Sequence, residues 1–494
     1  MINAKPYKIK SPLQKRRFKK KTEKTIELLK THLTAKERAI LNMQIAIFIT
    51  HIKTLHNALD FILFWFDLFC GAGGTSTGIH HSNTKSYVAS CTNHDFFALA
   101  THEKNHPHSL HFQEDIRDFK NVIKLRYFAE KLQRAFPNSK LNLWASLECT
   151  NYSKAKGGQA RDADSRSLAD HMPMYLEHLD LVSFWVENVR EFMSWGPLDE
   201  NGKPESRNSG KDYIRWIKEI ELFGFRTDHR ILNSANFGSY QSRERLFIQF
   251  VAKGFPIAWP EQTHTKDKVE SVLFPMEKWK KVRDILDLSD EGKSIFERKK
   301  PLADNTLGVI AKGIVKAMKE NEDTFIFKYY GNGDNYSSIN NTSGTVTCKD
   351  RFAILKLIFN QYKTGNISSV NYPIGAVTGV PKQNILSFIL NPSHGGHTTS
   401  IDRSSPTVIA RQDKAPLYLL KAIMDEYGII DIKMRMVHIP ELLQIQGFPK
   451  YYKLMGNKTQ QKKQIGNAVD VWQASAISKC SFDVIENHFI KMTA

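Results

Sequence analysis

The sequence is poor in cysteine and has no long hydrophobic run. Its 494 residues include only five cysteines, and none has the Cys-x-x-Cys spacing that is typical of zinc sites. So few cysteines also argue against a secreted scaffold held together by disulfides. The apolar stretch FILFWF at 61–66 is too short to span a bilayer, and no signal-peptide core follows the basic N-terminus. We therefore expect a soluble, intracellular protein without a metal site.

Acidic residues are scarce as well. The chain has 51 Asp and Glu against 70 Lys and Arg, which gives a net charge of +19 and a pI near 9.4. This balance favours a polyanionic partner, most simply nucleic acid, over a basic protein with no such partner. Lys and Arg are crowded into residues 1–33, and this arm either contacts DNA phosphates or is a solvated tail.

A helix is predicted directly after the basic arm. Thr34 and Glu37 have the spacing of a capping box, which marks the start of a helix. Apolar residues then recur at steps of four and three, namely Leu41, Ile45, Phe48, Ile52, Leu55 and Leu59. Such a stripe is typical of an amphipathic helix that packs on another part of the protein.

The central part of the chain has the pattern of an α/β domain. Five short apolar runs alternate with helical stretches: FILFWFDLF (61–69), SYVASC (86–91), LNLWAS (141–146), LVSFWV (181–186) and RLFIQFV (245–251). This alternation predicts a parallel sheet with helices on both faces, in which functional groups gather beyond the carboxyl ends of the strands. Residues 252–430 are irregular, whereas 436–494 return to helical character and end in a predicted helix from about Val469 to Ile490.

The ends of the predicted strands carry polar residues. The first strand runs into DLFCGAGGTSTGI, whose glycines allow a tight turn into a helix and leave main-chain N–H groups free for a ligand. Cys149 follows the LNLWAS run, and Glu187 comes directly after FWV. Gln241, Arg243 and Arg245 are spaced by two as they enter the last run, so we expect them to face the same side.

The order of these motifs resembles that of the cytosine-5 DNA methyltransferase family. DLFCGAGG is similar to the family's cofactor loop, ECTNYS to its nucleophile loop, ENV to its glutamate motif and QSRER to its Gln-x-Arg-x-Arg strand. HIPELLQIQGFP (438–449) and KKQIGNAV (462–469) are similar to its last two motifs. The resemblance implies a doubly wound, mostly parallel α/β sheet of the S-adenosylmethionine-dependent methyltransferase fold.

The resemblance also implies four parts in the chain. Residues 1–60 form the basic arm and helical extension, and 61–251 form the catalytic domain. Residues 252–430 form an irregular target-recognition domain. Residues 431–494 return to the catalytic domain, where the last helix packs beside the first strand.

The family's chemistry assigns a role to each catalytic candidate. Cys149 would add to carbon 6 of a flipped-out cytosine, so that carbon 5 can take a methyl group from S-adenosylmethionine. Glu187 would hold or protonate ring nitrogen 3, and Arg245, helped by Arg243, would contact the carbonyl oxygen. Taken alone, Cys149 is equally well explained as a buried core residue. The other four cysteines are expected to be structural.

The resemblance places the cofactor at the edge of the sheet, with binding residues both from the glycine loop region and from the far end of the chain. Cofactor-binding residues are expected at the glycine loop, after the second apolar run, in the stretch EDIRDF and in the GNAV motif: Phe69, Gly71, Gly73, Gly74, Asn93, His94, Asp115, Ile116, Asn467 and Ala468. The expected cofactor is S-adenosylmethionine, with S-adenosylhomocysteine as the product and no metal.

Two positions depart from the family's pattern. The nucleophile loop reads Glu148-Cys149-Thr150 instead of Pro-Cys-Gln, and a carboxylate beside the thiol would raise the pKa of Cys149 unless it points away. After the second strand, Asn93 and His94 stand where the family has an acidic residue, which predicts weaker binding of the ribose.

Three functions fit the sequence. The first is a bacterial or phage DNA cytosine-5 methyltransferase that acts on double-stranded DNA in the cytoplasm, as a monomer and in some cases beside a cognate restriction endonuclease. The second is an RNA (tRNA) cytosine-5 methyltransferase, and the third is a DNA-binding relative with impaired catalysis. The sizeable 252–430 region favours duplex DNA, because base edges must be read in a groove.

Overall fold

The chain divides into two compact units. The computed structural model describes residues 22–147, 168–197, 209–267, 275–302, 304–320, 323–328, 336–348, 352–359, 388–391, 397–400, 418–419 and 429–493. Unit 1 comprises Met1–Trp279 and Gln446–Ala494, and unit 2 comprises Lys280–Ile445. Among the described helices, none combines the length and the apolar character needed to cross a membrane.

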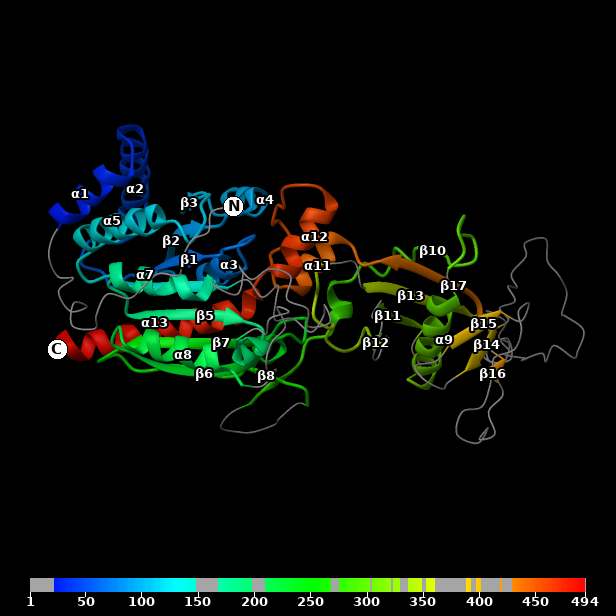
Figure 1. Cartoon of the computed structure of the whole chain (residues 1–494). Coiled ribbons are helices and arrows are strands. Elements are labelled where there is room, and N and C mark those ends of the chain that lie inside the picture. The colour runs from blue at the N-terminus through cyan, green and yellow to red at the C-terminus, as the bar shows by residue number, and fades with distance from the viewer. Residues whose placement is uncertain are drawn as a thin grey trace, which may run out of the picture. The chain divides into compact units, whose positions relative to one another are not determined.

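A seven-stranded, mostly parallel sheet forms the centre of unit 1 (Figure 1). Its strands, in spatial order, are β3 (Leu110–Phe112), β2 (Ser86–Thr92), β1 (Leu63–Leu68), β4 (Lys140–Ser146), β5 (Ser183–Asn188), β7 (Glu244–Ala252) and β6 (Phe225–Asn233). The first five are parallel, whereas β7 is antiparallel to both β5 and β6. All five predicted strands are confirmed, and the predicted parallel α/β sheet is present.

Helices cover both faces of this sheet, as a doubly wound fold requires. The helices of unit 1 that follow β1 are α3 (Gly74–Ser82), α4 (Phe96–Asn105), α5 (Phe119–Ala135), α7 (Met172–His178), α8 (Lys211–Glu221), α12 (Lys458–Asn467) and α13 (Val471–Thr493). Successive side chains of β1 point to opposite faces. Phe64 and Phe66 pack into one core with Phe128 of α5, whereas Trp65 packs into a second core with Ile477 of α13.

The N-terminal extension is a pair of helices, α1 (Thr22–His32) and α2 (Ala35–Leu55). The predicted capping box is confirmed, because Thr34 accepts a hydrogen bond from the Glu37 N–H and the Glu37 carboxylate accepts one from the Thr34 N–H. The predicted stripe is buried from Leu41 to Ile52, and Phe48 lies edge-on to Phe128 of α5 at 5.4 Å.

The apolar stripe of α2 is shorter than predicted. Leu55 is 52% exposed and Leu59 is 72% exposed, because the helix ends at Leu55 with His56 as its C-cap. Beyond that point the helical spacing no longer determines which side a residue faces.

Unit 1 continues past residue 251, as far as Trp279. Trp259 lies edge-on to Trp185 of the sheet, with 5.3 Å between the ring centroids. Its indole N–H donates to the Asp228 carboxylate of β6 at 2.7 Å. A short parallel pair, β8 (His264–Thr265) and β9 (Glu277–Lys278), follows. Short 3-10 helices complete the described parts of the two units: η3 (Leu168–His171), η4 (Arg190–Ser194), η5 (Ser234–Phe237) and η6 (Val282–Ile285).

Unit 2 is more regular than its sequence suggests. Its five-stranded antiparallel sheet has the order β10 (Lys293–Ser294), β17 (Ile429–Met436), β13 (Phe352–Phe359), β11 (Thr324–Lys328) and β12 (Tyr336–Ser338). A three-stranded sheet has the order β15 (His397–Ser400), β14 (Phe388–Asn391) and β16 (Tyr418–Leu419). Helix α9 (Asp304–Lys319) packs Ile310 and Ile314 against Phe325 of the larger sheet. The strands of unit 2 are short and far apart in sequence, so the sequence shows no regular alternation of strands and helices in this region.

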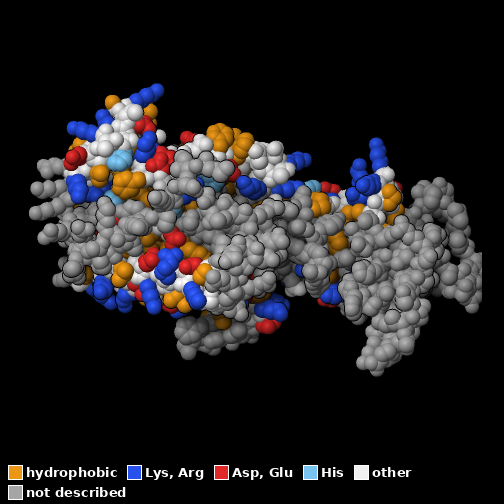
Figure 2. All heavy atoms as spheres, in the orientation of Figure 1, with side chains coloured by type: hydrophobic (Ala, Val, Ile, Leu, Met, Phe, Trp, Pro, Cys, Tyr) orange, Lys and Arg blue, Asp and Glu red, His pale blue; other side chains and the backbone are white. Residues whose placement is uncertain are grey.

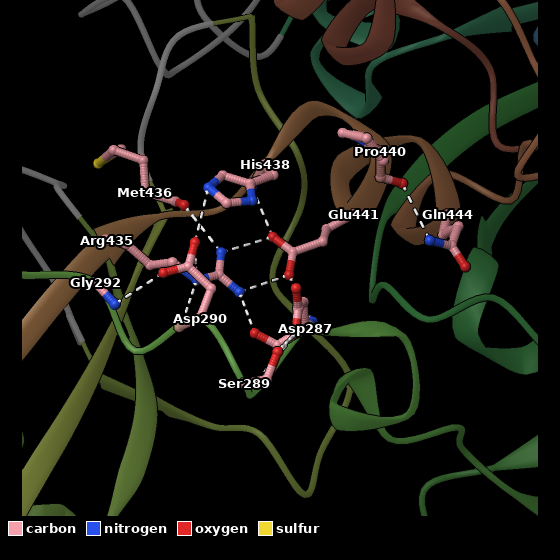
Figure 3. Close-up of polar contacts among 10 residues, drawn as sticks. All are labelled: Asp287, Ser289, Asp290, Gly292, Arg435, Met436, His438, Pro440, Glu441 and Gln444. Carbon is pink, nitrogen blue, oxygen red and sulfur yellow. Dashed lines mark hydrogen bonds and ion pairs between the residues drawn. The ribbon is translucent and has the colours of Figure 1, made fainter.

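A buried ion pair fastens β17 to the following helix, α11 (Ile439–Ile445) (Figure 3). Arg435 and Glu441 are 7% and 4% exposed, and two guanidinium nitrogens donate to the carboxylate at 2.7 and 2.9 Å. Glu441 also accepts the backbone N–H groups of His438 and Asp287. The glutamate of the HIPELLQIQGFP motif therefore holds the turn from strand to helix together.

Candidate active site

The carboxyl ends of the parallel strands of unit 1 meet at one edge of the sheet. Leu68, the last residue of β1, pairs with Thr92 of β2 and Ala145 of β4, and Thr92 pairs with Phe112 of β3. The segments that follow these strands therefore emerge side by side, as predicted. This edge carries the glycine loop, Asn93, Asp115 and Glu187.

The glycine loop has an unusual backbone conformation. Phe69 has φ 59°, which is rare for a residue with a side chain, and Gly71 and Gly73 have φ 52° and 96°. Among the described residues, only the Phe69 carbonyl oxygen would lie within 4 Å of a Cβ on Gly71, at 3.9 Å, so these residues leave one side of the turn open. An open turn of this kind lets a ligand approach the backbone closely.

The next glycine serves packing within the protein. A Cβ on Gly74 would lie 2.2 Å from the Val469 carbonyl oxygen, which is backbone and cannot move aside. Gly74 begins α3, so its missing side chain lets the start of this helix contact the segment before α13. Gly74 is also among the residues expected to bind the cofactor, and that role stays a prediction.

The C-terminal segment closes over the glycine loop from the other side. The hydroxyl of Tyr452, which is buried, donates to the Ala72 carbonyl oxygen. Ala468 is also buried, and its carbonyl oxygen accepts from the Gln446 side chain at 2.7 Å, whereas Asn467 at the end of α12 is exposed. Sequence reasoning missed Tyr452, since a single tyrosine between helices carries no signal.

The residues after β2 and β3 are held by local hydrogen bonds. The Asn93 N–H donates to the Phe112 carbonyl oxygen at 3.1 Å, and the Asn93 side chain accepts from the Asp95 N–H. Asp95 then caps α4, over which Figure 2 shows an exposed apolar patch, and Phe96 is 58% exposed. An exposed aromatic residue therefore follows Asn93 three positions later in the chain.

Asp115 lies in a charged pair at the same edge. Burial alone would raise the pKa of Asp115, but hydrogen bonds and the charge of Arg117, with a contribution from His94, hold that pKa below its usual value. Ile116 is buried, and its backbone carbonyl accepts from the Tyr175 hydroxyl at 2.7 Å. The Asp115 carboxylate is therefore a charged acceptor at this edge.

Glu187 and Arg245 come together as an ion pair. Glu187 lies in β5, opposite Ser146 of β4, and is 7% exposed. Its Oε1 is 3.2 Å from Nε of Arg245 on the neighbouring strand β7. Burial raises the pKa of Glu187, and the charges of Arg245 and Arg243 only partly oppose this. The carboxyl group can therefore hold a proton more readily than an ordinary glutamate.

Gln241 and Arg243 contact the C-terminal segment. The Gln241 amide donates to Gln446 at 2.8 Å and to Asp470 at 2.9 Å, and Nη1 of Arg243 donates to the Gly466 carbonyl oxygen at 3.3 Å. Asp470, missed by sequence reasoning, also accepts from two backbone N–H groups in the first turn of α13. These contacts join the residues that precede β7 to the end of the chain.

The expected nucleophile, Cys149, lies outside the described residues, as do Glu148 and Thr150. The described part of β4 ends at Ser146, three positions before the cysteine, and Ser146 is the register partner of Glu187. The roles of Cys149, Glu187, Arg243 and Arg245 remain predictions.

Comparison with known proteins identifies the family. The model of the C-5 cytosine-specific DNA methylase family matches residues 64–481. The chain is 27% identical over 209 residues to the type II methyltransferase M.AgeI of Thalassovita gelatinovora, which is 42% of this chain and 44% of that protein. It is 26% identical over 230 residues to M.BspRI of Lysinibacillus sphaericus, which is 41% of this chain and 48% of that protein. These matches span about half the length of the relatives.

The chain also aligns with solved structures. The crystal structure of a mutant of Spodoptera frugiperda DNMT2 aligns over 85% of this chain and 99% of its own, with 14% identity and a TM-score of 0.46. The family model covers most of the sequence, from β1 to α13. The chain therefore belongs to the family of C-5 cytosine-specific DNA methylases.

Proposed function

We propose that the protein is a DNA (cytosine-5-)-methyltransferase that methylates a cytosine within a specific duplex sequence. The observation that carries this proposal is the buried Glu187–Arg245 pair at the carboxyl edge of the sheet, beside the strand that leads to Cys149. Relatives named as type II methyltransferases support a role in restriction-modification, with a cognate endonuclease as the partner. The flipped-out base, the covalent step and a monomer acting in the cytoplasm of a bacterial or phage-infected cell belong to the same proposal.

The edge of the sheet fits S-adenosylmethionine. The positive φ angles at Phe69 and Gly71 expose backbone beside β1, and Asn93 and Asp115 supply polar groups at the ends of the next two strands. Phe96, three positions after Asn93 in the chain, adds an exposed aromatic side chain. Phe69, Gly71, Gly73, Gly74, Asn93, His94, Asp115, Ile116, Asn467 and Ala468 would line this site. When bound, S-adenosylmethionine supplies an electrophilic methyl group.

The protein side chains would prepare the cytosine. The Cys149 thiolate forms a bond to carbon 6, and Glu187 gives its proton to ring nitrogen 3, so that the electron pair gathers at carbon 5. Arg245 donates to the cytosine carbonyl oxygen and stabilises the developing charge. Arg243, which is tied to Gly466, holds the start of β7 in place. After methylation a base removes the hydrogen of carbon 5, the sulfur leaves and Glu187 regains its proton.

The proposal is tested by methyl transfer with a labelled methyl donor. Purified protein is incubated with S-adenosylmethionine and either unmethylated genomic duplex DNA or tRNA, and the nucleosides are separated after digestion. We expect the label in 5-methyldeoxycytidine from DNA. Label only in tRNA would support an RNA enzyme, and DNA binding without label would support a catalytically impaired relative. Either result would contradict the proposal.

A further inference from the structure

Two cysteines and a histidine meet in the interior of unit 1. Cys70 lies in the glycine loop after β1, Cys91 in β2 and His102 in α4. Cys70 is 5% exposed, and Cys91 and His102 are fully buried. The two sulfur atoms and one ring nitrogen all lie within 4.8 Å of one another, and Sγ of Cys91 is 3.2 Å from Nε2 of His102. Such distances are close to those between ligand atoms that share one ion.

The imidazole of His102 is oriented for coordination. Its Nδ1 lies 2.9 Å from Nε2 of His111, so the second ring nitrogen faces Cys91 and Ser76. Histidines that bind metals almost always use the other ring nitrogen in a hydrogen bond of this kind, which fixes the tautomer and the ring plane. His111 would accept the Nδ1 proton.

A buried carboxylate lies next to these three side chains. Asp67 of β1 is the register partner of Cys91, so both side chains point to the same face of the sheet. Its Oδ2 accepts from the Ser76 hydroxyl, which also lies 2.8 Å from Nε2 of His102. Its Oδ1 is buried and has no hydrogen-bond partner among the described residues. A buried carboxylate oxygen without a partner is costly, and a positive charge nearby would lower that cost.

We propose that Cys70, Cys91 and His102 bind one zinc ion. Two thiolates and an imidazole are ligands that zinc prefers. On binding, the two thiols release their protons to solvent, and the ion exchanges three of its water molecules for two sulfur atoms and one nitrogen. Cys-x-x-Cys spacing is absent, because three separate elements supply the cysteines and the histidine.

The ion would fasten the glycine loop to the sheet. Cys70 stands between Phe69 and Gly71, whose positive φ angles shape the open turn, and its N–H already donates to the Thr92 carbonyl oxygen. Coordination would join this loop to β2 and α4 by bonds stronger than one hydrogen bond. The role is structural, so it does not depend on the reaction proposed for the site.

Metal content tests the proposal without any activity assay. The full-length protein is purified with a reductant, passed through a desalting column and analysed for zinc, and cobalt is then exchanged into a second sample. We expect about one zinc per chain and an intense thiolate-to-cobalt charge-transfer band. A folded protein that retains no zinc and shows no such band with cobalt would overturn the proposal, as would a Cys70–Cys91 disulfide in peptide mapping.

Matched variants locate the site. Cys91→Ser should lose the zinc and the cobalt band, whereas Cys480→Ser and Cys348→Ser should keep both, because these cysteines lie in other parts of the chain. His111→Ala should weaken zinc retention by about 10–100-fold yet keep the thiolate–cobalt band. If Cys91→Ser does not fold, the His111→Ala and wild-type measurements decide. Zinc retained in full by a folded Cys91→Ser variant would contradict the assignment.

Discussion

Replacing Glu187 by glutamine should lower the activity of the protein without lowering its stability at higher pH. Glutamine keeps the shape of the side chain but can neither ionise nor give up a proton. Loss of a positioned general acid lowers the rate by about 10²–10⁴-fold, or roughly 3–5 kcal/mol in the activation barrier. We therefore expect a loss of this size in methyl transfer to genomic duplex DNA, measured with a labelled methyl donor.

Although the variant should lose activity, it should become more stable relative to the wild type as the pH rises. Burial raises the pKa of Glu187 above its ordinary value of 4.5, despite the two arginines. The folded protein therefore binds this proton more tightly than the unfolded chain does. The resulting stabilisation is complete below about pH 4.5 and is lost as the pH rises through the raised pKa, at about 1.4 kcal/mol per pH unit. The glutamine variant cannot lose this stabilisation. Its free energy of unfolding should therefore rise relative to that of the wild type between about pH 4.5 and the raised pKa of Glu187.

The matched control is Glu219→Gln. Glu219 pairs with Arg215 on the exposed side of α8 at 2.9 Å, so its loss should change stability by less than about 1 kcal/mol and leave the rate unchanged. Urea titrations of the three proteins at several pH values give the comparison. The reasoning is refuted if the Glu187 variant keeps full activity, or if it loses stability relative to the wild type as the pH rises.

Three further changes test the surroundings of the site. Gly74→Ala should lower stability by about 1–3 kcal/mol, because its Cβ would meet the Val469 carbonyl oxygen at 2.2 Å; an unchanged melting temperature would contradict this close approach. Asp470→Asn should lower the free energy of unfolding in urea by about 1–3 kcal/mol, because an amide nitrogen would face the amide donor of Gln241. An unaltered urea midpoint would show that the hydrogen bonds of Asp470 do not contribute to stability. Deleting residues 1–21, which hold nine Lys and Arg, should reduce the salt slope of DNA binding by about 0.9 for each phosphate that the arm neutralises; an equal slope would make the arm a solvated tail. This deletion stops before α1, whose Leu29 is buried, so the melting temperature should not change.

The sequence predicted those features that local pattern determines. All five apolar runs are strands, since a strand that is buried on both faces of a sheet needs a continuous apolar stretch. The capping box at Thr34 is present, and the last helix, predicted from about Val469 to Ile490, spans Val471–Thr493. Strand β6 was missed, because most of its residues are polar and only Phe225 and Leu232 are buried.

Interactions between distant parts of the chain could not be predicted. Glu187 and Arg245 were both selected from the ends of apolar runs, but their pairing depends on the antiparallel placement of β7 beside β5. The hydrogen bonds of Tyr452 with Ala72 and of Asp470 with Gln241 join residues more than two hundred positions apart. The Cys70, Cys91 and His102 cluster was missed for the same reason, because its members are close only in the folded chain.

The most direct test of the account is to capture the bond between the protein and its target base. A library of random duplex DNA carrying 5-fluorocytosine is incubated with the protein and S-adenosylmethionine, and the products are separated under denaturing conditions. The account predicts a covalent complex that mass spectrometry maps to Cys149 and that Cys149→Ser abolishes, because fluorine at carbon 5 prevents release of the sulfur. Methyl transfer to ordinary DNA at full rate by Cys149→Ser, or a product methylated on the exocyclic amine, would contradict it.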